Sequence, residues 1–146
     1  MKLHNIFFGK PDGSYIQVML LLLRIGSGSF LLTHGIPKFK KLMAGGEIKF
    51  SDPIGLGPEV SLILAVFTEV VCTSMIILGL GTRIAAFIGI GFMSIISFIV
   101  HGPDPFGRKE LPLMYLMIFL VLLIFGGGKY SIDHLLGRNS GPLSKE

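Results

Sequence analysis

Four long apolar runs, separated by short polar connections, constrain this chain more than any other feature. They cover residues 15–33, 60–80, 84–100 and 111–125. A hydrocarbon core of about 30 Å needs roughly 20 predominantly apolar residues per helix, which these runs approach. None shows the period-2 alternation of a strand, and a membrane segment must satisfy its own backbone groups. The sequence therefore predicts an all-α integral membrane protein, a four-helix bundle formed by one domain over residues 1–146.

The connections between the runs contain most of the charged residues, and two polar tails flank them at 1–14 and 129–146. Only 15% of the residues are charged, against roughly 25% in soluble domains, and the net charge is +4. Because the bases lie between membrane segments, we expect anionic lipid headgroups and not nucleic acid as their partners. Four spans would put both chain ends on one side (side A), with the first and third connections opposite (side B). Lysine and arginine are divided evenly between the sides, so charge alone does not orient the chain.

A weak internal repeat relates the two halves. The first run ends "SFLLTHGIP" and the third ends "SFIVHGP", while the second and fourth end "GLGTR" and "FGGGKY". This pattern is compatible with two copies of a helical hairpin related by an axis along the membrane normal. It predicts that His34 and His101 lie at corresponding corners on side B.

Arg24 lies in the middle of the first apolar run, too far from either end to reach the headgroups easily. Charged residues inside a membrane usually have a buried partner. Counting from His34 and from Pro58 at 1.5 Å per residue puts Arg24 and Glu69 at similar depths, about 15 Å from side B. We therefore predict an intramembrane Arg24–Glu69 ion pair, which would fix helix registry or hold a polar ligand.

Helical spacing extends this polar interior into stripes of residues that share a face. The first stripe contains Arg24, Ser27, Gly28, Leu31, Gly35 and Lys38; the second contains Glu69, Cys72, Thr73 and Ile76; the third contains Ser94, Ser97 and His101. Inward-facing polar stripes with apolar outer faces predict a bundle whose interior is partly polar.

The side B mouth of this interior is expected to carry His34, Lys38, His101 and Glu110, with Glu59 nearby. Imidazole beside carboxylate suits proton transfer near neutral pH, so these residues are candidates for ligand binding or a proton relay. Helix capping at the headgroup level is the structural alternative. No metal site is expected, because zinc would lack its third and fourth ligands, and haem ligation by two histidines at helix ends is disfavoured.

These features together resemble the DoxX family of small bacterial membrane proteins. The matching residues include "LLRIGSGSFLLTHGIPKF", Glu69, "LGLGTRIAA", His101, Glu110 and "GGGKYSIDHLL". The resemblance implies a bacterial inner-membrane protein with four helices and both termini in the cytoplasm. It also implies a link to quinone-coupled sulfur oxidation or to membrane complexes that handle oxidative stress, but it supplies no catalytic residues.

Three functions fit these observations. The first is a redox-linked membrane subunit that binds a quinone in the bundle, with a redox or stress-response protein as partner. The second is a scaffold or assembly partner without chemistry of its own, and the third is a carrier for a small or lipidic solute. The sequence does not decide whether the chain is an enzyme; if it is, we expect a quinone-linked oxidoreductase subunit. It also leaves open whether the chain forms a homo-oligomer.

Overall fold

A computed structural model describes residues 13–139 of the chain, and every regular element within that range is helical. Its helices are α2 (Gly13–Ala44), α3 (Pro58–Val66), α4 (Thr73–Leu78), α5 (Thr82–Ile95), α6 (Phe106–Phe125) and α7 (Ile132–Asn139). Two π-helical segments join them: η1 (Phe67–Cys72) connects α3 to α4, and η2 (Ile96–Val100) extends α5. The predicted all-α class is confirmed.

Among residues 13–139, three helices are long and apolar enough to cross a membrane: Gly13–Ala44, the continuous helix Pro58–Leu78, and Thr82–Val100. The fourth predicted span corresponds to α6, which has 20 residues. Its first turns carry Arg108, Lys109 and Glu110, and it is not among the three. The second and third predicted spans thus agree closely with the structure, whereas α6 begins five residues before the predicted 111.

The first predicted span was too short, because α2 continues past Thr33 to Ala44. The stretch "HGIP" predicts a helix end, since proline removes a backbone donor and crowds the preceding turn. Pro37 instead lies inside the helix. Membrane helices tolerate proline where side-chain hydroxyls and neighbouring helices satisfy the freed backbone groups. His34 is therefore an interior helical residue, whereas His101 follows the last turn of η2, so the two histidines do not occupy matching helix ends.

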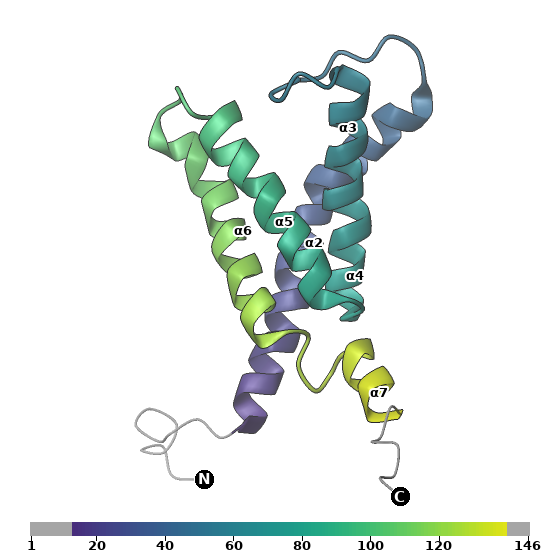
Figure 1. Ribbon diagram of the computed structural model, residues 1–146, viewed down its shortest axis with the longest axis vertical. Helices are drawn as coiled ribbons and strands as arrows, with labels where there is room; N and C mark the ends of the chain where they lie inside the picture. The colour runs from purple at the N-terminus through teal and green to yellow at the C-terminus, as the bar shows by residue number, and fades with distance from the viewer. Residues whose placement is uncertain (1–12, 140–146) are drawn as a thin grey trace, which may run out of the picture.

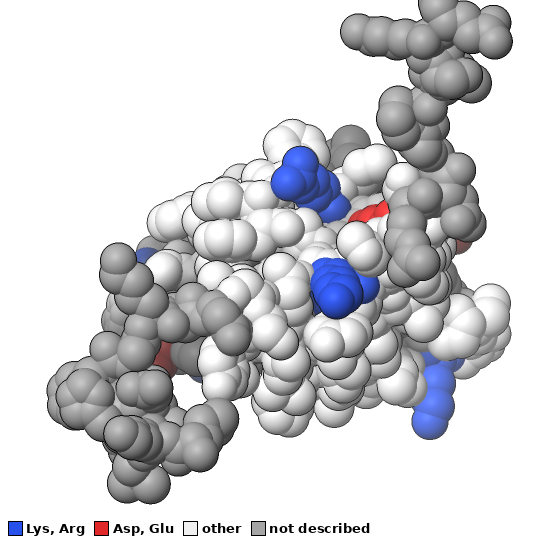
Figure 2. Space-filling view, turned by 90° about the horizontal axis from the view of Figure 1, so that it is seen from below, with Lys and Arg blue, Asp and Glu red and all other residues white. Residues whose placement is uncertain are grey.

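The helices form two pairs, shown in Figure 1. In the first pair, α2 packs against α3, η1 and α4; in the second pair, α5 and η2 pack against α6. The pairs meet near the end that carries the start of α2 and helix α7, and they diverge toward the opposite end. We keep the names side A for the α7 end and side B for the divergent end. Viewed from side A, Lys and Arg side chains are separate projections on a surface that is otherwise largely uncharged (Figure 2).

The first pair depends on glycines of α2 that let the helices approach closely. A Cβ atom at Gly35 would lie 2.8 Å from the backbone oxygen of Glu69, and one at Gly28 would meet the side chain of Ile77. Small residues at such contacts allow the van der Waals packing that drives association in lipid. The buried face of α2 follows the predicted stripe: Leu20, Arg24, Ser27, Gly28, Leu31 and Gly35.

Hydrogen bonds that involve Asp133 hold helix α7 against the side A end. Its carboxylate accepts bonds from the backbone amides of Gly81 (2.7 Å) and Thr82 (2.9 Å), and its own amide donates to Gly79 O at 2.8 Å. The carboxylate thus caps the start of α5, where free amides and the helix dipole favour negative charge. Burial alone would raise the pKa of Asp133, but these hydrogen bonds and the charge of Arg24 outweigh it and lower the pKa.

We expect Gly35→Ala to destabilise the protein by about 1–3 kcal/mol, because its Cβ meets backbone that cannot move aside cheaply. Gly26→Ala is the matched control on the same helix, since nothing lies within 4 Å of its added Cβ. The free energy of unfolding of both variants is measured in mild detergent by titration with a denaturing detergent, with circular dichroism as the signal. Equal stability of the two variants would contradict the close contact at Gly35.

We expect Asp133→Asn to weaken the docking of α7 by about 1–2 kcal/mol, the usual cost of losing a helix cap. Amides of Gly81 and Thr82 should then exchange with deuterium roughly five to thirty times faster. Because folding lowers the pKa of Asp133, its stabilisation is complete above the ordinary aspartate pKa of about 3.9. That stabilisation is lost as the pH falls through the lower folded pKa. Unchanged exchange in the variant would mean that α7 is held by other contacts.

Candidate functional site

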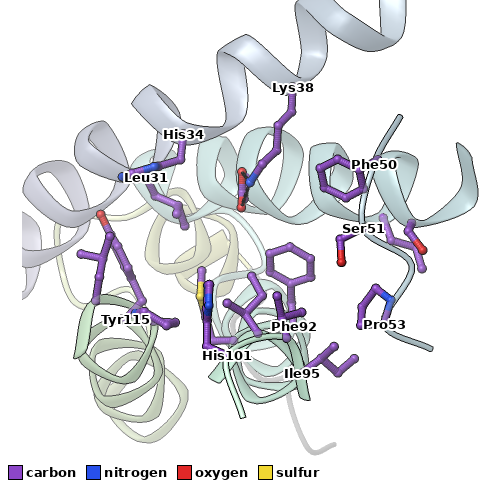
Figure 3. Close-up of a pocket in the computed structure, with 18 of the residues that line it drawn as sticks. Leu31, His34, Lys38, Phe50, Ser51, Pro53, Phe92, Ile95, His101 and Tyr115 are labelled. Carbon is purple, nitrogen blue, oxygen red and sulfur yellow. Dashed lines mark hydrogen bonds and ion pairs between the residues drawn. The ribbon is translucent and has the colours of Figure 1, made fainter. Parts of the chain in front are cut away.

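A cavity of about 320 Å³ lies between the two helix pairs on the side B half. Residues from α2, the connection to α3, the α3–η1 helix, the α5–η2 helix and α6 all contribute to its walls. Figure 3 shows that the labelled side chains surround a common space. The lining residues are Leu31, His34, Lys38, Phe50, Ser51, Pro53, Ile54, Ser61, Leu64, Glu69, Phe92, Met93, Ile95, Ile96, Val100, His101, Arg108, Leu111, Pro112 and Tyr115.

The main charged feature of the cavity is an ion pair between Lys38 of α2 and Glu69 of η1. Lys38 Nζ lies 2.5 Å from one carboxylate oxygen of Glu69 and 2.6 Å from the other. The Glu69 side chain is only 3% exposed, against 28% for Lys38. A buried carboxylate without a cation would be strongly unfavourable, so Glu69 requires this lysine. The Lys38 ammonium group donates hydrogen bonds to both carboxylate oxygens of Glu69 and also lines the cavity.

The predicted Arg24–Glu69 ion pair is corrected by this geometry, because Glu69 pairs with Lys38. The depth count was wrong at its starting point. It treated His34 as the side B end of the first helix, but α2 continues ten residues further. The level of Glu69 on α2 is marked by Gly35, whose backbone touches it, and Lys38 follows one turn later. Arg24 lies eleven residues before Gly35, about 16 Å nearer to side A.

Arg24 is fully buried at the side A end of the first pair. Its Nη2 donates a 2.5 Å hydrogen bond to the backbone oxygen of Tyr130. Gly79, which ends α4 in the left-handed conformation, leaves room for the guanidinium, and Asp133 contributes a favourable charge. A cation at a helix C-terminus is also stabilised by the helix dipole. Arg24 thus joins α2, α4 and the segment before α7, and it lies outside the cavity.

A second pair of titratable side chains, joined by a hydrogen bond, belongs to the other helix pair. His101 Nδ1 lies 2.8 Å from Asp104 Oδ2 in the turn between η2 and α6, and both side chains are partly exposed. The hydrogen bond from His101 and the charge of Arg108 hold the pKa of Asp104 below its usual range, although its burial opposes this. The carboxylate is therefore the acceptor, and the imidazole carries its proton on Nδ1.

The other predicted candidates are divided between the cavity and the surface. His34 lines the cavity, whereas Glu110 is exposed in the early turns of α6 and is not among the lining residues. Sequence reasoning missed Asp104 and Tyr115. Asp104 could have been noticed three residues after His101, a spacing that suits a local hydrogen bond. Tyr115 carries no such signal, since it stands within an uninterrupted apolar run.

The connection from α2 to α3 closes one side of the cavity with Phe50, Ser51, Pro53 and Ile54. Its shape is fixed by Asp52, whose carboxylate accepts hydrogen bonds from Leu56 N (2.9 Å), Gly57 N (2.8 Å) and Ser61 Oγ (2.9 Å). Chiefly the hydrogen bond from Gly57 lowers the pKa of Asp52. The segment is therefore an ordered wall, tied to the start of α3.

Both π-helical segments border the cavity. Glu69 lies within η1, while Ile96 and Val100 lie within η2 and lead directly to His101. A π-helical turn widens a helix by one residue and changes the direction of the side chains on either side, and such turns are frequent at functional sites. Here η1 places Glu69, and the end of η2 places His101, on the walls of the same cavity.

A double-mutant cycle distinguishes the observed ion pair from the predicted one. Lys38→Met should destabilise the protein by about 3 kcal/mol, because Glu69 stays buried without a cation. Glu69→Gln should cost less, because Lys38 reaches water. The two changes together should show a coupling of about 1–3 kcal/mol, whereas Arg24→Met and Glu69→Gln should be additive within about 0.5 kcal/mol. Reversible unfolding in detergent gives the free energy of each single and double variant, and coupling between Arg24 and Glu69 would contradict the structure.

Comparison with known proteins identifies the relatives of this chain. It is 32% identical over 130 residues to an uncharacterized protein of Haemophilus influenzae, covering 82% of this chain and 92% of that protein. A second uncharacterized protein of the same organism is 27% identical over 136 residues, covering 88% and 90%. No solved structure is significantly similar. The DoxX family matches residues 19–102, which include the whole of the Lys38–Glu69 pair. The chain is therefore a member of the DoxX family of membrane proteins.

Proposed function

We propose that this protein is a redox-linked membrane subunit that binds the headgroup of a quinone in the cavity between its helix pairs. The observation that carries the proposal is the Lys38–Glu69 ion pair, a buried charge placed on the wall of a largely apolar cavity. Small-molecule sites combine apolar walls with a few polar groups that fix orientation. A structural ion pair alone would not require a cavity beside it.

The lining chemistry suits a flat ring that carries oxygen atoms. Lys38 has three ammonium hydrogens and can donate to a quinone oxygen while it remains paired with Glu69. Apolar side chains such as Phe92, Met93 and Ile96 would contact the ring. His34 and His101 are the candidates for exchanging protons with water. Electrons would come from a partner redox protein, which this chain does not include.

The same proposal includes how the protein lies in its membrane. We propose a four-helix bundle in the bacterial inner membrane, in which α6 is the fourth span and its charged first turns lie among the headgroups of side B. Both chain ends would face the cytoplasm, and lipids would cover the exposed apolar faces. A duplication origin for the two helix pairs remains a prediction from the sequence.

A scaffold without ligand is the competing function, and the Arg24 cluster favours it in one respect. That cluster joins three segments through a buried charge and borders no part of the cavity, so at least one intramembrane charge serves packing alone. If the Lys38–Glu69 pair served packing alone as well, its replacement by neutral residues would change the stability of the protein at most and would leave partner assembly intact.

Quinone binding to the purified protein tests the proposal. Lipid extracts of protein purified in mild detergent should contain quinone, and titration with decylubiquinone should saturate at one molecule per chain. The double variant Lys38→Met/Glu69→Gln, which removes both charges and so avoids an unpaired one, should bind about tenfold more weakly, a loss of about 1.4 kcal/mol. Lys40→Met is the matched control, since Lys40 is exposed on the same helix and does not line the cavity.

Two results would overturn the proposal. One is the absence of quinone in the extract together with no saturable binding by the native protein, which would leave the scaffold function. The other is equal binding by the native protein and the double variant, which would move the quinone to a different surface.

A further inference from the structure

The His101–Asp104 pair determines whether one wall of the cavity donates or accepts hydrogen bonds. Asp104 is ionised, so it can only accept, and the 2.8 Å contact to Nδ1 must carry the imidazole proton. In the neutral ring the other nitrogen, Nε2, then has no hydrogen and can only accept a hydrogen bond. Figure 3 shows the His101 ring extending from its wall toward the space that separates it from Lys38.

The opposite wall has the reverse polarity. Lys38 is an ammonium group, with donors and no acceptor, and Glu69 already holds two bonds from it. The donor and the acceptor belong to different helix pairs, because Lys38 lies on α2 and His101 follows the end of η2. Between them the walls are formed by apolar side chains, among them Leu31, Met93 and Ile96. The cavity therefore offers a donor on one wall and an acceptor on the other, with apolar surface between.

We infer that this cavity selects the reduced, hydroquinone form of its ligand over the oxidised quinone. This inference rests on the proposed function and specifies the redox state that the site prefers. A hydroquinone has a hydroxyl group at each end of its ring. One hydroxyl donates to Nε2 of His101, and the oxygen of the other accepts from Lys38 Nζ. A quinone has carbonyl oxygens only, so its second oxygen would face the acceptor Nε2 without a hydrogen between them.

Asp104 is the positioning residue in this arrangement, because it fixes which imidazole nitrogen bears the proton. An asparagine in its place could accept from Nδ1–H through its oxygen or donate to Nδ1 through its amide. In the second case Nε2 would carry the hydrogen and would favour a carbonyl. The preference between the two redox forms therefore depends on a carboxylate that need not touch the ligand itself.

Paired titrations of the purified protein with decylubiquinol and decylubiquinone, under anaerobic conditions, test the inference. The native protein should bind the quinol about tenfold more tightly, the value of one additional buried hydrogen bond. His101→Phe should abolish the preference, and Asp104→Asn should reduce or reverse it. Glu110→Gln is the matched control, because it neutralises an exposed carboxylate at the same end and should leave the ratio unchanged. Nitrogen-15 NMR of the imidazole should show the proton on Nδ1 in the native protein and a changed tautomer in Asp104→Asn.

The outcomes separate this inference from the function on which it rests. If neither ligand binds, the proposed function fails and the inference fails with it. If both ligands bind equally well, or the quinone binds more tightly, quinone binding stands and the inference is overturned. A preference for the quinol that persists unchanged in both His101→Phe and Asp104→Asn would also overturn it, since the selection would then arise elsewhere in the cavity.

Discussion

A carboxylate buried in a membrane helix must have a cation, and much of this structure follows from how Glu69 obtains one. Lys38 can reach it only because α2 continues through Pro37 and because Gly35 allows the two helices to touch. The long side chain of Lys38 then spans the rest of the gap and neutralises Glu69 from the cavity side. Helix length, close packing and the charge of the cavity wall are thus consequences of one requirement.

Periodicity was sufficient to predict which faces of the helices are buried. The stripe from Arg24 to Gly35 is buried, because spacing along a regular helix determines direction without knowledge of the neighbours. The stripe from Glu69 to Ile76 is buried as well, although it begins in η1. Partners across helices are a different matter. They depend on where each helix begins, and the prediction that α2 ends near His34 shifted its register by about three turns. That shift gave Glu69 the wrong cation.

The sequence predicted the candidate site only in part, because contacts between helices cannot be derived from spacing along one helix. His34, Lys38 and His101 were expected together because they lie on one side of the membrane, and all three line the cavity. Glu110 was expected there too, but the direction of a side chain in the first turns of α6 depends on how α6 packs against α5. Neither π-helical segment could be read from the sequence, since no residue type specifies the additional residue in such a turn. The ligand roles of these residues remain predictions.

The bond between Arg24 and Tyr130 has a consequence for how the protein is made. The two residues are 106 positions apart, so the guanidinium enters the membrane long before its acceptor has been synthesised. Until the last segment arrives, the guanidinium lacks this acceptor, and the translocation machinery or surrounding water must accommodate it. A chain that stops before Tyr130 would lack the acceptor of Arg24 Nη2. Completion of synthesis is in this way connected to the packing of the first helix.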